Sequence, residues 1–110
     1  MLEALWSVEF MSNSQGVGAG VVVIENGKVL GGDAQYFYVG ECKVENGSVH
    51  ATVKVTHYFG QPHSVFGTAK QFTLSLAGSP AQTTFDMSGY VIENPQQKIL
   101  IRFTRRAELP

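Results

Sequence analysis

Cysteine is almost absent from this chain, and its scarcity excludes several kinds of site. Cys42 is the only cysteine in 110 residues, so neither an intrachain disulfide nor a zinc site built from one chain's thiolates can form. A lone thiol weakly favours a reducing compartment. No family-specific signature surrounds Cys42, which favours a small buried hydrophobe over a nucleophile paired with histidine.

Charge is also scarce. Charged residues make up 15% of the chain, against about 25% in a typical globular protein, which predicts a wide interior or a partner covering part of the surface. The net charge of −1 excludes nucleic-acid binding driven by overall charge. Basic residues do gather after position 97, and we interpret them as charged protection of an edge strand rather than a patch for an acidic partner or nucleic acid. They are Lys98, Arg102, Arg105 and Arg106.

Long apolar runs and an early basic segment are missing. No Lys or Arg precedes Lys28, which argues against a secretory signal. The longest apolar run, Val17 to Ile24, contains two glycines and is less than half of the ~20 residues that a membrane helix needs. We expect a soluble, cytoplasmic protein without a membrane span.

No segment has the apolar spacing of an ordinary helix, and alternation with a period of two dominates instead. Such alternation gives a strand one apolar and one polar face. Four clear sets are Trp6/Val8/Phe10, Ala51/Val53/Val55, Phe72/Leu74/Leu76 and Ile99/Ile101/Phe103.

Turn signals separate the strands. Asn26-Gly27 and Asn46-Gly47 are typical of tight hairpins, because a type I′ turn needs two residues with positive φ. Gly60-Gln61-Pro62, Gly78-Ser79-Pro80 and Asn94-Pro95 end later segments. Every connection looks short enough for a hairpin. The sequence therefore predicts an all-β fold, an antiparallel up-and-down (calycin/lipocalin-like) β-barrel of about eight strands, as one domain over residues 1–110.

Three glycines, Gly16, Gly18 and Gly20, fall on one face of the second strand. Their missing side chains permit sharp coiling or close approach by another segment. The spacing superficially resembles a dinucleotide fingerprint, but the third glycine is misplaced and no helix follows.

Alternation also selects the side chains that would line the barrel and contact a small ligand, with Tyr36 or His57 orienting it. These candidates are Trp6, Phe10, Tyr36, His57, Phe72, Phe85 and Phe103.

The histidines do not form a metal-ligand pattern, and we expect neither a metal nor a cofactor. His50 and His57 point to opposite faces of one strand, and His63 lies in a loop. An enzyme using the lumen, such as an isomerase or cyclase, remains an alternative that would rely on Asp33, Asp86 or His57. Against it, Asp33 is best explained as a turn residue capped by its own carboxylate. Alternation also turns Asp86 outward with Thr84 and Ser88, while Phe85, Met87 and Val91 face inward.

Aromatic residues stand on both faces of one strand, at Tyr36, Phe37 and Tyr38. One face can line the barrel, so the other must be covered or exposed. Together with Met11, Val22 and Ile24, interpreted as outer-face residues, this predicts an apolar patch and a homodimer.

Several short motifs have a familiar arrangement. The Gly31-Gly32-Asp33 turn follows the Asn26-Gly27 hairpin and precedes Tyr36–Gly40, and the chain opens with Trp6–Ser12. With Gly18–Val21, and further on His57-Tyr58, Pro62 and Ser64–Gly67, this pattern resembles the GrlR-like family of bacterial type III secretion regulators.

The resemblance implies a small, dimeric, calycin-like β-barrel with a cavity for a lipid-like molecule. It also implies repression of virulence genes by binding a helix-turn-helix activator rather than DNA, through an acidic run. At the corresponding position this chain reads Val44-Glu45-Asn46-Gly47, so the acidic run is absent.

We therefore expect a non-enzymatic regulatory or protein-interaction module of GrlR type, with a small or dry cavity and a regulatory protein as partner. The alternative is a barrel that binds or senses a small lipid-like ligand, which predicts a sizeable apolar cavity.

Overall fold

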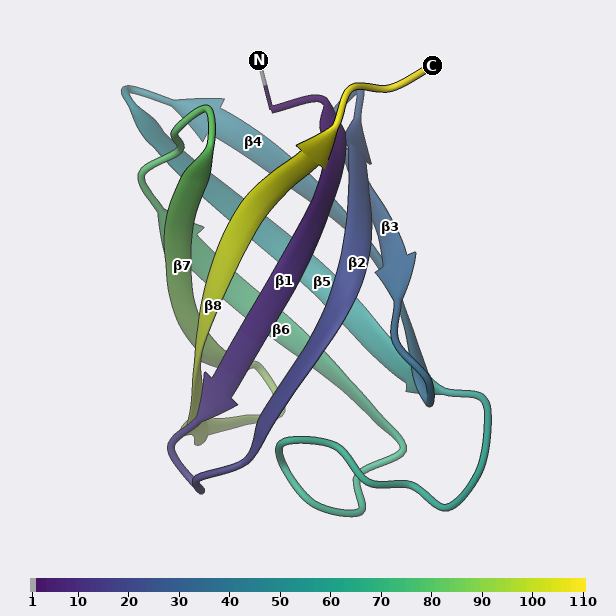
Figure 1. The fold of residues 1–110 in the computed structure, drawn as a ribbon. Coiled ribbons are helices and arrows are strands. Elements are labelled where there is room, and N and C mark those ends of the chain that lie inside the picture. Colours follow the sequence, from purple (N-terminus) through teal and green to yellow (C-terminus); the bar gives the residue numbers. More distant parts are fainter. Residues whose placement is uncertain (1) are drawn as a thin grey trace.

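The computed structural model describes residues 2–110 and contains eight strands that close into one barrel (Figure 1). Each strand pairs antiparallel with its neighbours in sequence, and the last strand pairs with the first. This confirms the predicted eight-stranded up-and-down barrel. The strands are β1 (Ala4–Ser12), β2 (Val17–Glu25), β3 (Lys28–Gly32), β4 (Tyr36–Glu45), β5 (Ser48–His57), β6 (Gln71–Gly78), β7 (Thr84–Val91) and β8 (Asn94–Ala107).

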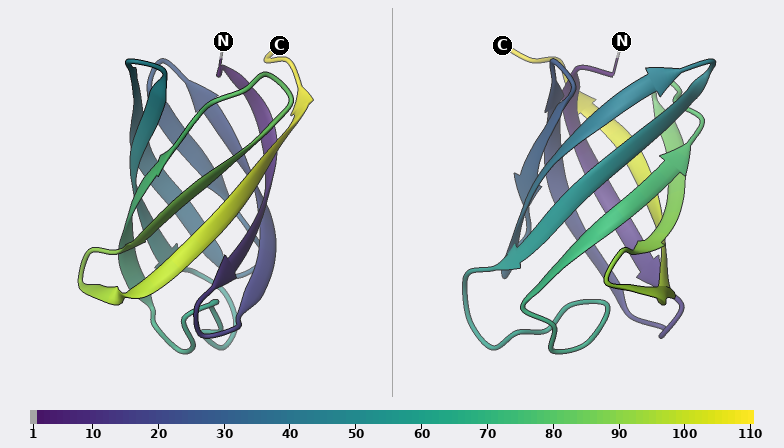
Figure 2. Two further views of the ribbon diagram at one scale, coloured as in Figure 1. Left: turned by 90° about the vertical axis from the view of Figure 1, so that its left-hand side faces the viewer. Right: turned by 180° about the vertical axis from the view of Figure 1, so that it is seen from behind.

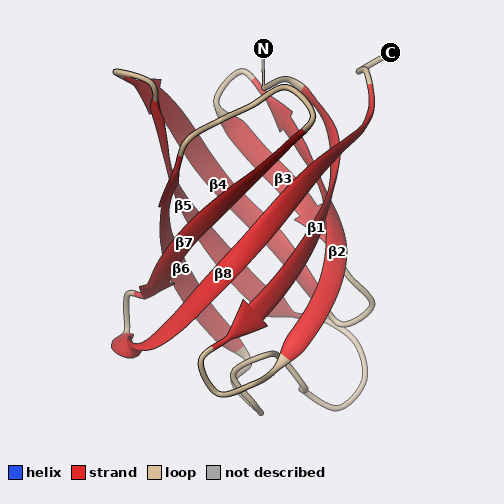
Figure 3. Cartoon of the chain, turned by 60° about the vertical axis from the view of Figure 1, so that its left-hand side comes forward, coloured by secondary structure: helices blue, strands red, loops and turns tan. Residues whose placement is uncertain are grey.

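Within the described part of the chain there are only strands, turns and loops (Figure 3). No helix there is long and apolar enough to cross a membrane.

Two of the tight turns have the chemistry that the sequence predicts. Asn26 and Gly27 have φ values of 53° and 74°, and Asn46 and Gly47 have 53° and 79°. Both residues of each turn are thus in the left-handed region, as a type I′ hairpin requires. The turns fix the pairing of β2 with β3 and of β4 with β5.

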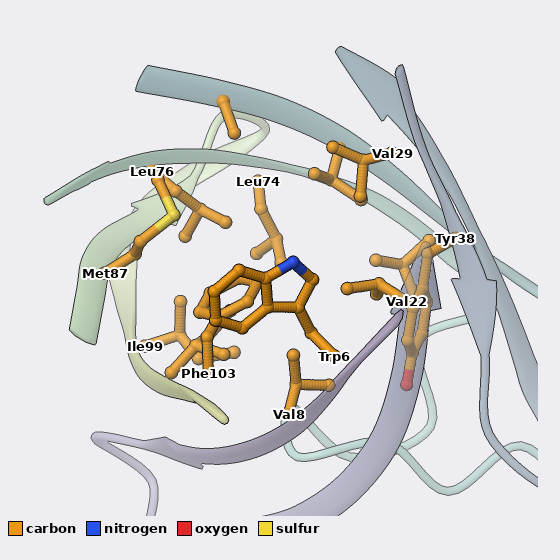
Figure 4. Close-up of a cluster of buried hydrophobic side chains, with 14 of the residues drawn as sticks. Trp6, Val8, Val22, Val29, Tyr38, Leu74, Leu76, Met87, Ile99 and Phe103 are labelled. Carbon is orange, nitrogen blue, oxygen red and sulfur yellow. The ribbon is translucent and has the colours of Figure 1, made fainter. Parts of the chain in front are cut away.

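The inward faces of the strands form one continuous core. Trp6 and Val8 on β1 and Leu74 and Leu76 on β6 are all buried, and they approach one another across the lumen (Figure 4). The pattern of β5 alternates regularly from buried Val49 to buried Val55. Alternation therefore identified the interior correctly on these strands.

Strand β2 is the exception. Val22 and Ile24 are buried core residues, so the prediction that they lie outside is wrong. The run Val21–Ile24 is apolar on both faces, and alternation alone cannot choose between them. Met11 is exposed as predicted.

Three further expectations need correction. Strand β8 pairs with both β1 and β7, so its basic residues protect no edge. The turn before β8 is Ile92-Glu93, and Asn94-Pro95 already belong to the strand. The connection between β5 and β6 spans residues 58–70, far longer than a tight hairpin loop. It folds beneath the open end of the barrel (Figures 1 and 2).

Candidate functional site: an apolar cavity in the barrel

A cavity of about 930 Å³ occupies the barrel between its centre and the end that carries the β1–β2, β3–β4 and β5–β6 loops. Volumes of this size accommodate a drug-sized ligand. Its wall is mainly aliphatic and aromatic and comes from most of the strands. Typical lining residues are Phe10, Val22, Val53, Phe72, Leu74, Ile101 and Phe103.

The other end of the barrel is closed by Trp6. Its indole is fully buried, packs edge-on against Phe85 at 5.1 Å between ring centroids, and donates its N–H to the Leu2 carbonyl at 2.8 Å. The Arg105 guanidinium lies 5.5 Å from the Trp6 ring centroid. A large side chain with its polar atom satisfied thus separates the cavity from this end.

The long β5–β6 loop (residues 58–70) covers part of the open end of the barrel. Val65 and Phe66 are buried, and Phe66 packs edge-on against Phe72 at 5.4 Å. The Ser12 hydroxyl donates to the Val65 carbonyl at 2.6 Å, which fixes the loop to the β1–β2 turn. A Cβ on Gly16 would lie 2.5 Å from that same carbonyl oxygen, so this glycine permits the close approach.

Two inward glycines on β2 make room for larger side chains. A Cβ on Gly18 would meet the Phe10 ring at 2.5 Å, and one on Gly20 would meet the Tyr38 hydroxyl at 2.8 Å. The predicted close approach at these glycines is therefore found, and it shapes the cavity wall.

Polar side chains gather at the loop end of the cavity. They belong to three loops and the beginning of β8, whereas the wall along the strands is apolar. The group consists of Ser14, Gln15, Asp33, Gln35, His63, Ser64 and Gln97.

Asp33 is the one carboxylate among the described lining residues. Its Oδ1 accepts the backbone N–H groups of Gln35 and Tyr36, each at 2.9 Å. This is the turn capped by its own carboxylate that the sequence predicted. Its Oδ2 accepts the Tyr38 hydroxyl. Burial, and then this hydrogen bond, hold the pKa of Tyr38 well above its ordinary value.

All seven predicted lumen residues lie on the inner side of their strands, but only three of them line the cavity. Phe10, Phe72 and Phe103 line the cavity, whereas Trp6 and Phe85 close its far end. Tyr36 and His57 pack against each other at 5.4 Å between ring centroids. The Tyr36 hydroxyl donates to the Ala69 carbonyl at 2.6 Å, which helps hold the β5–β6 loop.

His57 contains an unusual buried atom. Its Nε2 has no hydrogen-bond partner within residues 2–110, although buried polar atoms rarely lack one. Neither His57 nor Tyr36 is among the residues that line the cavity, and a role for either in orienting a ligand stays a prediction.

The residues of the enzyme alternative are not brought together. Asp86 is on the outer surface, where the Arg102 Nε donates to it at 2.9 Å, and the Arg102 guanidinium lowers the pKa of Asp86. Asp33 is at the loop end of the cavity. No group of three His, Cys, Asp or Glu able to hold a metal occurs among the described residues.

The sequence did not reveal that Val65 and Phe66 of the β5–β6 loop cover the cavity mouth, or that Tyr38 pairs with Asp33. The apolar pair Val65-Phe66 in this loop was the available signal, since Val and Phe are among the residues most often buried.

Comparison with known proteins supports the fold alone. A solved structure described as a redesigned β-barrel matches with a TM-score of 0.51 and 10% identity, covering 96% of this chain and 91% of that chain. No family model matches the chain, and no curated protein matches it. The resemblance to the GrlR-like family therefore stays a prediction.

Proposed function

We propose that the chain is a non-enzymatic binding protein for a small, largely apolar molecule, held inside the barrel. The single observation that carries this proposal is the 930 Å³ cavity with its apolar wall and polar mouth. A regulator acting only through its surface would need no such space, because barrels of eight strands can be filled by their own side chains. The lipid-like ligand implied by the GrlR-like resemblance agrees with this chemistry.

The experiment that tests this proposal fills the cavity with a larger side chain and measures ligand binding. Val53 lines it, whereas its neighbour Thr52 is exposed on the outer face of the same strand. We expect Val53→Trp to weaken binding of the apolar fluorophore N-phenyl-1-naphthylamine at least ~tenfold, because the indole occupies the ligand's volume.

The matched control is Thr52→Trp, which adds the same indole outside the barrel and is expected to leave the affinity unchanged. Circular dichroism and urea unfolding of both variants establish that each folds. Equal affinities in folded V53W and T52W would refute the proposed site. Native mass spectrometry of the purified protein, followed by denaturation, would then identify any molecule carried from the cell.

A second candidate function is a protein-interaction module that acts as a homodimer. The observation that favours it is a set of exposed apolar side chains on the outer surface of β2, β3 and β4. Exposed Leu30 and Val39 pair across β3 and β4, half-buried Val23 lies beside Leu30 on β2, and exposed Phe37 lies on the same face beside Tyr58. Lys28 and Glu41 pair with each other at one end of this surface, 3.9 Å apart, so they leave no unpaired charge there that would oppose contact with a second copy of the chain.

Sedimentation velocity tests this candidate. Leu30→Lys should convert a dimer to a monomer, whereas Leu100→Lys, which changes an exposed leucine on β8, should not. A wild-type monomer at all concentrations would exclude the dimer.

A further inference from the structure

The Tyr38–Asp33 pair at the mouth of the cavity imposes a direction on the hydrogen bonds that it can make with a ligand. The Tyr38 hydroxyl proton is committed to Asp33 Oδ2. The Tyr38 oxygen can still accept a hydrogen bond, as can the second lone pair of Oδ2. This pair therefore presents acceptors, and no free donor, to the cavity.

Neighbouring groups hold Tyr38 and Asp33 in fixed positions. Asp33 Oδ1 is occupied by the backbone N–H groups of Gln35 and Tyr36, so the carboxylate cannot rotate without breaking the turn. The Tyr38 hydroxyl lies against Gly20, where a Cβ would approach it to 2.8 Å. Both acceptors are thus held in place before a ligand arrives, which lowers the entropic cost of using them.

The charged groups at the mouth also favour a hydrogen-bond-donating head group over an anionic one. Asp33 contributes a carboxylate, and neither Lys nor Arg occurs among the described residues that line the cavity. An anionic head group beside Asp33 would therefore meet a like charge, with His63 as the basic side chain at this end.

We propose that the cavity selects molecules with an apolar body and a hydrogen-bond-donating head group, a primary ammonium or an alcohol, over carboxylates such as fatty acids. The head group would donate to Asp33 Oδ2 and to the Tyr38 hydroxyl oxygen, while the chain extends along the wall toward Trp6. This inference rests on the proposed function, because it names the ligand class of the same cavity.

The test compares three probes with the same ten-carbon chain: decylammonium, 1-decanol and decanoate. Each displaces N-phenyl-1-naphthylamine from the wild-type protein at neutral pH. We expect decylammonium to bind at least about tenfold more tightly than decanoate, since hydrogen bonds to charged groups are the stronger class, with 1-decanol between them.

Asp33→Asn is designed to reverse the preference without removing the turn. The Asn carbonyl can still accept the two backbone N–H groups, while its amide N–H₂ donates to the Tyr38 oxygen. The Tyr38 hydroxyl is then free to donate into the cavity. We expect D33N to lose the preference for decylammonium and to gain affinity for decanoate by about tenfold.

Asp86→Asn is the matched control, because it removes the same charge from the outer surface, where Asp86 pairs with Arg102. It should keep the wild-type order. Tyr38→Phe gives a second, independent variant. It removes one of the two acceptors and leaves the Asp33 carboxylate in place, so it should bind decylammonium more weakly than wild type but still prefer it to decanoate, a preference that D33N loses.

The outcomes separate the two proposals. Binding of the fluorophore with no preference among the three head groups, or with decanoate preferred, would overturn this inference alone. The same holds if D33N and D86N behave alike. Failure of the fluorophore and of all three probes to bind would overturn the proposed function as well.

Discussion

Gly89 provides a quantitative test of how closely the backbones of β6 and β7 approach each other. Gly89 faces inward on β7, and a Cβ there would lie 1.7 Å from the Ser75 carbonyl oxygen of β6, below the 3.0 Å that real contacts respect. That oxygen belongs to the backbone, so Gly89→Ala requires β6 and β7 to separate by roughly 1 Å. Such a shift lengthens the ladder hydrogen bonds beyond their useful range of about 3.2 Å.

The expected cost follows from this geometry. Loss of two ladder hydrogen bonds at about 1 kcal/mol each, with strain added, gives about 3–5 kcal/mol. This is a large part of the about 5–15 kcal/mol by which a small domain is stable. With a urea slope of about 2 kcal/mol per molar, the unfolding midpoint should fall by about 2 M.

Gly18→Ala is the matched comparison. Its Cβ would approach Phe10 to 2.5 Å, but the contact is with the far end of a side chain that borders the cavity. The ring can turn into that space, so we expect a change within about 1 kcal/mol. Both variants gain the same intrinsic strand preference of alanine over glycine. Equal urea midpoints for G89A and G18A would refute the claim that backbone proximity makes Gly89 necessary.

Three further predictions follow from single side chains. Burial and Asp33 raise the pKa of Tyr38. The stability that comes from this raised pKa is complete below the ordinary Tyr pKa of 10.0 and is lost as the pH rises above it. Above pH 10 the urea midpoint of Y38F should therefore fall less steeply than that of wild type, and parallel slopes would contradict this. Burial raises the pKa of the Cys42 thiol, so Ellman's reagent should react several-fold more slowly with the native protein than with the urea-unfolded chain at the same pH; equal rates would show an open thiol. Trp6→Ala removes a fully buried indole and leaves the Leu2 carbonyl without its donor, which should cost about 3–5 kcal/mol in urea unfolding, whereas a loss below about 1 kcal/mol would mean that Trp6 does not close the barrel.

The sequence was informative wherever a local rule applies. The Asn-Gly turns at positions 26–27 and 46–47 fixed two hairpins, because few other residues tolerate two successive positive φ values. Alternation oriented the inner faces of β5, β6 and β8, since their outward positions are mostly polar. The capped turn at Asp33 was also readable, because the side chain bonds to its own neighbours in sequence.

Alternation failed where both faces of a strand are apolar. On β2, Val22 and Ile24 point inward and Val21 is exposed, and nothing in the run itself distinguishes these faces. Pairing decided the matter, because Gly18 and Gly20 must face Phe10 and Tyr38 inside the barrel.

By itself, then, the sequence determined the strand number, the antiparallel order and the nature of the interior, because these depend on turn chemistry and on a period of two. Only the tertiary structure decided that a cavity remains inside. Whether a barrel is filled depends on how side chains from opposite strands and from the β5–β6 loop meet across the lumen. The orientation of Tyr38 toward Asp33 was likewise decided by contacts between segments, since that hydroxyl is placed by the turn on one side and by Gly20 on the other.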